Sequence, residues 1–186
     1  MRLLTITTIF LLVTNGLGAQ TADTIYQLDP VSKLHSLKEY SHVFVDEKEL
    51  FSVEEVVNGE ADSLFQPLNL TASSLPAYRN CWLKFTIQSK EEFKNWWLLL
   101  RDSTWAVATA AADIIRIYRG GQAELLGENG IYIPRSEKSV RKNAGFTGIA
   151  MSMTANETAT YYVQVYNYFG GGYPIPYPVI QSTELP

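Results

Sequence analysis

The sequence contains one cysteine, Cys81, among its 186 residues. A lone cysteine can form no intrachain disulfide and cannot supply the thiolates of a cysteine-based metal site. Histidine is scarce as well, because His35 and His42 are the only two, whereas zinc needs three or four convergent ligands. Cys81 precedes Trp82 in an apolar stretch, so we expect a small buried hydrophobic side chain there. The sequence therefore predicts no metal site and no cofactor.

Basic residues are fewer than acidic ones: the sequence has 15 lysines and arginines and 19 aspartates and glutamates, which gives a net charge of −4. Nucleic-acid binding draws most of its affinity from basic patches, so we expect no nucleic-acid partner. No apolar run reaches the ~20 residues that cross a bilayer. The run at residues 3–13 follows Arg2 and precedes small residues up to Ala19, as in a secretory signal peptide. We therefore expect residues 1–19 to direct export and to be removed.

Catalytic motifs are absent too. The sequence has no G-x-S-x-G nucleophile elbow, and no motif pairs a candidate serine or cysteine with a histidine base. The glycines at 120–121 and 170–172 are not followed by the Lys-Ser/Thr of a phosphate-binding loop. Glu54 and Glu55 are adjacent, so they point apart instead of facing one glycosidic bond. We therefore expect the protein not to be an enzyme.

What the sequence does contain is alternation of apolar and polar residues. In residues 81–88, Leu83, Phe85 and Ile87 fall on one face of an extended segment and polar side chains fall on the other, which predicts a half-buried β-strand. Further strands are predicted at residues 41–46, 96–100, 113–119, 122–126, 146–153 and 160–168. Leu50, Val53 and Val57 are spaced as on a helix, which Asn58-Gly59 would end. The pattern predicts an all-β jelly-roll sandwich with one short helix near residues 50–57.

The remaining segments set the predicted boundaries. Residues 20–40 are polar and weakly patterned, so we expect a loose N-terminal arm before a single domain at 41–186. The polar stretch 128–145 is long for a plain connection, and such loops are often functional or mobile. Prolines at 174, 176 and 178 cannot donate to a ladder, so any strand there is expected at a sheet edge.

Several motifs occur in the order and spacing of a known family. They are the acidic strand exit and helix at 46–56, F-Q-P-L at 65–68, C-W-L-K-F at 81–85, W-W-L-L-L at 96–100, D-I-I-R-I-Y at 113–118 and Y-Y-V-Q-V at 161–165. This set resembles the extracellular sensor domain of bacterial receptors with diverse intracellular signalling modules, in its second type (7TMR-DISM extracellular 2). Cys81 departs from the family pattern, which has an aromatic residue before the tryptophan.

The resemblance implies a jelly roll similar to carbohydrate-binding modules, placed outside the inner membrane. In the family such a domain precedes a seven-helix membrane region, which connects to a histidine kinase, a nucleotide cyclase or a related output. The sequence stops where those helices would begin, so it is either a fragment of a longer receptor or a stand-alone relative. A structural calcium, common in carbohydrate-binding jelly rolls, stays open by analogy of fold.

Aromatic side chains supply the candidate ligand site. Sugar rings stack their apolar face on flat aromatic side chains, while nearby polar groups bond the hydroxyls. Tyrosines crowd around the glycines at 170–172, and Trp105 stands in a loop of small residues. The predicted ligand-binding residues are Arg101, Trp105, Tyr166, Tyr168, Tyr173 and Tyr177, with Asp102 and Phe169 beside them. The alternative is that these aromatics are ordinary core and edge residues of the sandwich.

These observations favour an exported ligand-sensing domain on the periplasmic or extracellular side of a bacterial membrane. Its predicted ligand is a carbohydrate or another small molecule, and a homodimer stays open. One alternative is a secreted carbohydrate-binding module with no signalling role. Another is a structural or adhesion domain that pairs through an exposed edge strand.

Overall fold

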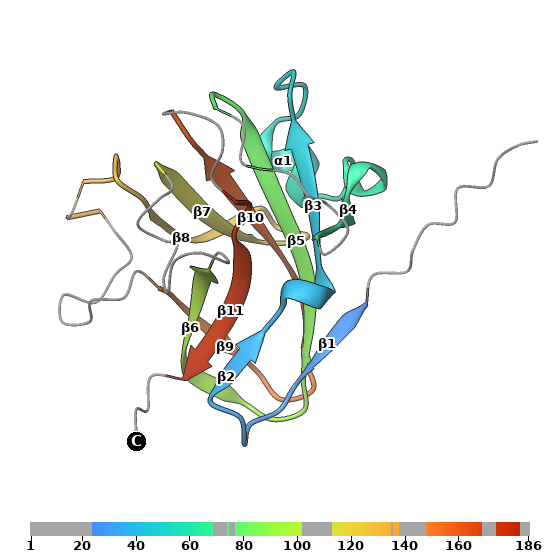
Figure 1. Ribbon diagram of the computed structural model, residues 1–186. Coiled ribbons are helices and arrows are strands. Elements are labelled where there is room, and N and C mark those ends of the chain that lie inside the picture. The colour runs from blue at the N-terminus through green and yellow to red at the C-terminus, as the bar shows by residue number, and fades with distance from the viewer. Residues whose placement is uncertain are drawn as a thin grey trace, which may run out of the picture.

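Two β-sheets pack face to face in the computed structural model, which describes residues 24–68, 74, 77–101, 113–134, 136–137, 148–168 and 174–182 (Figure 1). The larger sheet contains β1 (Ile25–Leu28), β3 (Ser41–Asp46), β4 (Gln66–Pro67), β5 (Asn80–Ser89), β7 (Ile114–Arg119), β8 (Glu124–Asn129) and β10 (Thr158–Tyr166). The smaller sheet contains β2 (Leu34–Ser36), β6 (Phe93–Arg101), β9 (Ile149–Met153) and β11 (Tyr177–Ser182). The predicted all-β jelly-roll sandwich is confirmed.

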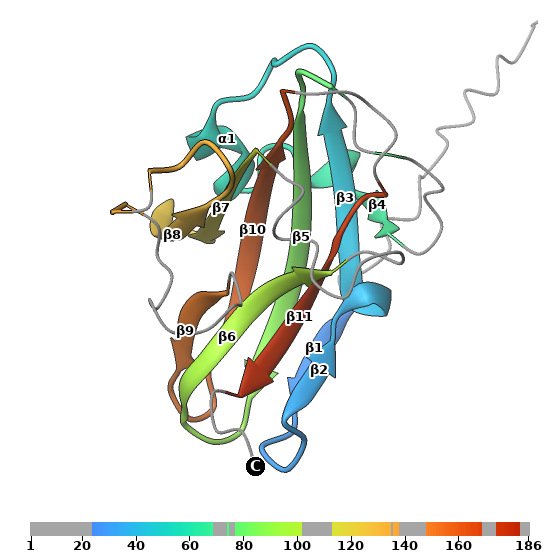
Figure 2. The ribbon, with the colours of Figure 1, turned by 60° about the vertical axis from the view of Figure 1, so that its left-hand side comes forward.

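The chain crosses repeatedly between the two sheets. The larger sheet has the order β4-β3-β5-β10-β7-β8 with β1 beside β5, and the smaller has the order β2-β11-β6-β9. From β5 onward the strands pass from the larger sheet to the smaller and back, so segments far apart in sequence become neighbours (Figure 2). Within each sheet the pairing is antiparallel, apart from β1, which runs parallel to β5.

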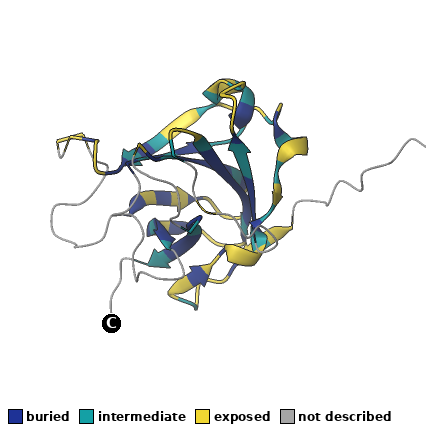
Figure 3. Cartoon of the chain, turned by 45° about the horizontal axis from the view of Figure 1, so that its top comes forward, coloured by how far each residue is buried: buried dark blue, intermediate teal, exposed yellow. Residues whose placement is uncertain are grey.

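Alternation along β5 builds the core between the sheets. Leu83, Phe85 and Ile87 are buried there, and the Phe85 ring stacks on Tyr161 of β10 with ring centroids 5.5 Å apart. Figure 3 shows long buried stretches on the central strands, whereas exposed residues lie on the turns and along strands at the sheet edges. Burial of this apolar surface is the main favourable contribution to folding.

The outer face of β5 is buried as well, which corrects the prediction of a half-buried strand. Trp82, Lys84 and Thr86 are 1%, 4% and 8% exposed. A segment containing α1 (Val53–Val57) and the 3-10 helix η2 (Asp62–Leu64) lies over this face, and Val56, Val57 and Ala61 pack with Trp82 in a second hydrophobic cluster. The alternating polar residues of β5 indicated a solvated face, whereas a short amphipathic segment covers it.

The helix ends where the sequence predicts, at Val57, and begins three residues later than predicted, at Val53. Ser52 caps α1 by accepting a hydrogen bond from the Glu55 backbone N–H at 3.2 Å, and the Glu55 carboxylate accepts one from the Ser52 N–H at 2.7 Å. This capping box satisfies two of the otherwise free N–H groups at the helix start. Leu50, expected on the apolar face, lies before the helix and is 67% exposed.

A charged network fastens this covering segment to the sheet. The Lys84 ammonium lies 2.9 Å from the Asp62 carboxylate, and the Lys84 side chain is only 5% exposed. The Tyr162 hydroxyl of β10 donates to the other Asp62 oxygen at 3.0 Å. Asp62 itself is 34% exposed, so one member of the network is still reached by water. The network joins η2 to two neighbouring strands of the larger sheet.

Residues 25–40 form part of the sandwich, contrary to the predicted loose arm. β1 pairs with β5, β2 pairs with β11, and the 3-10 helix η1 (Lys38–Tyr40) leads into β3. The segment therefore contributes a strand to each sheet and connects them. Its centre is His35, 2% exposed, whose Nδ1 lies 2.8 Å from the Tyr26 hydroxyl. The His35 Nε2 is buried and has no hydrogen-bond partner among the described residues.

Acid is expected to weaken the fold through His35. Burial is the main cause that lowers the pKa of His35 below its ordinary value. The unfolded state therefore binds a proton more readily, so this stabilisation is complete above the ordinary pKa of about 6.5 and is lost as the pH falls from there toward the lowered pKa. Thermal unfolding between pH 7 and 5 should show a falling midpoint whose slope is smaller in His35→Asn. Equal slopes in both proteins would contradict this role.

The last strand, β11, corrects another prediction. It lies in the interior of the smaller sheet, between β2 and β6, and not at an edge. Pro178 fits into this strand because the backbone pairing of β11 with β2 begins one residue later, where Val179 lies opposite Ser36. The Pro178 carbonyl accepts a hydrogen bond from the Leu37 N–H at 2.9 Å, so it still contributes to the connection with the N-terminal segment. The missing N–H falls where no ladder bond to β2 is made.

Candidate functional site

The structure separates the predicted ligand residues into two pairs. Arg101 and Tyr177 are opposite each other on β6 and β11, whereas Tyr166 and Tyr168 lie at the end of β10. Trp105 and Tyr173, with Asp102 and Phe169, lie outside the described residues. The four described residues therefore form two separate pairs. In the sequence, each pair is adjacent to other residues predicted to contact the ligand.

Tyr166 and Tyr168 belong to an aromatic group at one end of the larger sheet. Their ring centroids lie 4.8 Å apart at an interplanar angle of 67°. The ring of Tyr132 meets Tyr168 at 5.2 Å and 72°. Tyr78 contributes to the electrostatic surroundings of Tyr166 from the turn before β5. We call these four residues, Tyr78, Tyr132, Tyr166 and Tyr168, the tyrosine end.

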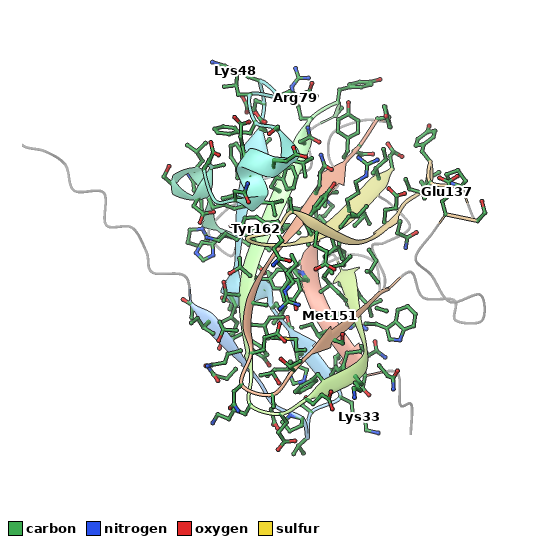
Figure 4. All side chains as sticks on the ribbon, turned by 180° about the vertical axis from the view of Figure 1, so that it is seen from behind. Lys33, Lys48, Arg79, Glu137, Met151 and Tyr162 are labelled. Carbon is green, nitrogen blue, oxygen red and sulfur yellow. The ribbon has the colours of Figure 1, made fainter. Side chains whose placement is uncertain are left out.

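The tyrosine end is open to solvent. Tyr78, Tyr132 and Tyr168 are 56%, 48% and 39% exposed. Figure 4 shows Arg79 and Lys48 at this end of the molecule and Lys33 at the opposite end. Apolar ring surface beside charged side chains gives both a stacking surface and hydrogen-bonding groups.

Asp113 positions two of the tyrosines. This residue is 3% exposed, and its carboxylate accepts a hydrogen bond from the Tyr168 backbone N–H. Its backbone carbonyl accepts a second one from the Tyr132 N–H at 3.1 Å. One buried residue at the start of β7 therefore holds the loops that follow β8 and β10.

Gly130 makes this arrangement sterically feasible. Its φ is +130°, and a Cβ atom there would lie 2.3 Å from the Asp113 carbonyl oxygen. The Gly130 N–H donates to the Asn129 side-chain oxygen at 2.8 Å, which fixes the turn after β8. Only glycine permits both this backbone conformation and this close approach.

Tyr78 is fixed from the other side of the sheet end. Its φ is +57°, and its N–H donates to the Asn167 carbonyl at 2.7 Å. The Arg79 guanidinium donates to the Tyr78 carbonyl at 2.7 Å. Partial burial, and then the nearby Glu49, raise the pKa of Tyr166. The Tyr166 hydroxyl is therefore protonated at neutral pH and can donate a hydrogen bond.

Arg101 and Tyr177 have a more structural setting. Tyr177 packs against the core, and the Lys38 ammonium lies 5.7 Å from its ring centroid. The Arg101 Nε is buried and finds no hydrogen-bond partner within the described ranges. A ligand role for this pair stays a prediction.

A metal ion and a reactive thiol each have requirements that can be compared with the described residues. Within the described residues, no group of three or more histidine, cysteine, aspartate or glutamate side chains could hold a metal ion. Cys81 is fully buried, as the sequence predicts, and burial raises the pKa of its thiol to about 12. A thiol with so high a pKa is not a nucleophile at neutral pH.

Sequence reasoning missed Tyr78 and Tyr132. Tyr132 lies in the long polar stretch 128–145, whose length indicated a functional loop but no particular residue. Tyr78 lies in the loop before β5, where nothing in the sequence distinguishes it from a surface residue. Their proximity to Tyr166 and Tyr168 depends on pairing between distant strands.

Comparison with protein families adds one match. A family model described as 7TMR-DISM extracellular 2 matches residues 38–170, from η1 to beyond β10. The matched region contains all four residues of the tyrosine end. No curated protein matches the chain. Among the described helices, none is long and apolar enough to cross a membrane.

Proposed function

The chain belongs to the 7TMR-DISM extracellular 2 family, whose members are extracytoplasmic sensor domains of membrane receptors, and we propose that it binds a carbohydrate at the tyrosine end. In this proposal the ligand reaches the domain on the periplasmic or extracellular side of a bacterial membrane. The output is a histidine kinase, a nucleotide cyclase or a related module. Binding would shift the receptor between two states by the difference in affinity of those states for the ligand.

The observation that carries the proposal is the exposure of contacting tyrosine rings. Tyr132 and Tyr168 meet edge to face at 5.2 Å while both remain about half exposed. Large apolar groups in this state usually mark a contact surface, because the hydrophobic effect favours covering them. The protonated Tyr166 hydroxyl can donate to a sugar oxygen. Stacking and hydrogen bonding together are what recognition of a sugar ring needs.

The position of the tyrosine end also supports the proposal. β11 ends at Ser182 at the opposite end of the sandwich, where Lys33 lies (Figures 1 and 4). If a membrane region follows the domain, as in the family, the tyrosine end faces away from the membrane. A ligand arriving from outside would then meet the exposed rings first.

Substitution of the exposed rings should weaken sugar binding. After a glycan array has identified a ligand, Tyr132→Ala and Tyr168→Ala should each lower its affinity up to about tenfold, because a stacked ring contributes about 0.5–1.5 kcal/mol. Isothermal titration calorimetry measures the effect. Leu34→Ala is the matched control, since Leu34 is 48% exposed on β2, away from the tyrosine end.

Two results would argue against the site. One is unchanged affinity in both tyrosine variants, and the other is an equal loss in the Leu34 control. Trp105→Ala and Tyr173→Ala test the remaining predicted residues in the same assay. The reading frame that follows residue 186 separates the sensor from a secreted binding module, because only a receptor encodes seven apolar helices there.

A further inference from the structure

A cleft of about 450 Å³ opens between the edges of the two sheets. Its walls come from β8, which pairs only with β7, and β9, which pairs only with β6 among the described strands. This volume falls in the range of small-molecule sites, about 300–1,000 Å³. Figure 4 shows Met151, on the β9 wall, well below Arg79 and Lys48. The cleft is therefore distinct from the tyrosine end.

Tyr161 supplies a polar group inside the cleft. The residue is only 1% exposed, and its ring stacks on Phe85 in the core. Tyr161 also lines the cleft. Burial raises the pKa of Tyr161 to about 12, so the hydroxyl keeps its proton. A protonated hydroxyl on the wall of a cleft can donate a hydrogen bond to a ligand or accept one from it.

One carboxylate that lines the cleft makes no ion pair with another described residue. The Arg119 guanidinium forms an ion pair with Glu157, and the Lys94 ammonium lies 2.8 Å from Glu92. Glu124 lines the same cleft opposite Arg119, yet it makes no ion pair within the described residues. Arg119 and Lys94 are both paired with carboxylates outside the lining, so Glu124 is the acidic group of the cleft that a cationic ligand can approach.

Apolar side chains complete the lining. Leu126 on β8 and Met151 on β9 face the same space as Glu124 and Tyr161. An alkyl or aryl group would find apolar contact there, and methionine adapts readily to the shape of such a group.

We propose that this cleft binds a small primary ammonium compound with an apolar body. The ammonium group would donate to the Glu124 carboxylate and the Tyr161 hydroxyl, and the apolar body would contact Leu126 and Met151. An ammonium carries three donors and one positive charge, which match the oxygen of a hydroxyl and a carboxylate that makes no ion pair among the described residues. The site is independent of the carbohydrate proposal, because none of its residues belongs to the tyrosine end.

Calorimetric titration with phenethylamine tests this site. We expect saturable binding with a dissociation constant on the order of 1 mM, as suits a ligand of this size. Its neutral isostere 2-phenylethanol and the anion phenylacetate should bind at least about fivefold more weakly. Equal binding of phenethylamine and 2-phenylethanol, binding of glucose in place of the amine, or no saturation by about 10 mM would overturn the proposal.

Two conservative variants test the residues. Glu124→Gln removes the charge and Tyr161→Phe removes only the hydroxyl, and each should weaken phenethylamine binding about fivefold. The melting temperature of Tyr161→Phe should stay that of the wild type, because the ring that packs in the core is kept and only the hydroxyl on the cleft wall is removed. Tyr168→Ala should leave phenethylamine binding unchanged while it affects the tyrosine end. Unchanged affinity for phenethylamine in either cleft variant would contradict the proposed amine site.

Discussion

Alanine at position 130 is expected to lower the melting temperature by about 6–12 °C, which corresponds to about 3 kcal/mol of unfolding free energy for a domain of this size. The added Cβ would lie 2.3 Å from the Asp113 carbonyl oxygen and 2.7 Å from its carbon. Both neighbours are backbone atoms, so no side chain can rotate away. The φ of +130° is also a conformation that alanine rarely adopts. Strain and collision therefore act together.

Gly121→Ala separates these two causes. Gly121 also has a positive φ, +83°, but a Cβ there would meet nothing within 4 Å. We expect a loss of about 1–2 kcal/mol, from conformational strain alone. Thermal unfolding of the two variants side by side measures the difference. If both lose equal stability, the contact between Gly130 and Asp113 has no energetic weight.

The Gly130 substitution should also disturb the candidate site. Asp113 holds the Tyr132 and Tyr168 backbones, so a displaced Asp113 would move both rings. The near-ultraviolet circular dichroism of tyrosine should then change in Gly130→Ala at temperatures where the fold persists. Gly121→Ala should keep the wild-type spectrum, because Gly121 lies in the turn between β7 and β8, at the other end of those strands.

Strong local alternation made part of the fold predictable. β3 has the predicted limits, Ser41–Asp46, and β5 extends the predicted strand by one residue at each end. These segments carry enough alternating apolar residues to bury a face wherever they pair. The N-terminal strands were missed because β1 and β2 are only four and three residues long. Their strand conformation depends on β5 and β11, which the local sequence does not encode.

Burial of the outer face of β5 was unpredictable for a related reason. Lys84 and Thr86 read as solvent-facing residues, since charged and hydroxyl side chains usually lie outside. The covering segment supplies a carboxylate for Lys84, and β10 supplies a hydroxyl for Thr86, with the Thr86 and Thr160 oxygens 2.9 Å apart. Partners distant in sequence therefore decide whether a polar residue is exposed.

Part of the candidate site could be predicted from the sequence and part could not. Tyr166 and Tyr168 were predicted because aromatic residues crowd together in that part of the sequence. Tyr78 and Tyr132 were not, because β5, β7, β8 and β10 must pair before the loops around them meet. Exposure of a ring is a property of the folded surface, and composition alone does not reveal it.

Removal of the Asp62 carboxylate is the second substitution with a large expected effect. Asp62→Ala should lower the free energy of unfolding by about 2–3 kcal/mol. Breaking a fully buried ion pair costs about 3–5 kcal/mol, and the smaller value is expected here because Asp62 is 34% exposed. The Lys84 ammonium, 5% exposed, would remain buried without this counter-charge at 2.9 Å. The Tyr162 hydroxyl would also lose its acceptor at 3.0 Å. Urea unfolding monitored by tryptophan fluorescence measures the loss, since Trp82 lies under the covering segment.

The opposite substitution should be much milder. Lys84→Met removes the buried charge and keeps a flexible apolar chain of similar length, while Asp62 stays partly solvated and still accepts from Tyr162. We expect a loss of about 1 kcal/mol or less. The double variant should be more stable than Asp62→Ala alone, because the ammonium that needed a counter-charge is gone. A double variant that loses the sum of both single costs would mean that the Lys84 and Asp62 side chains do not stabilise each other.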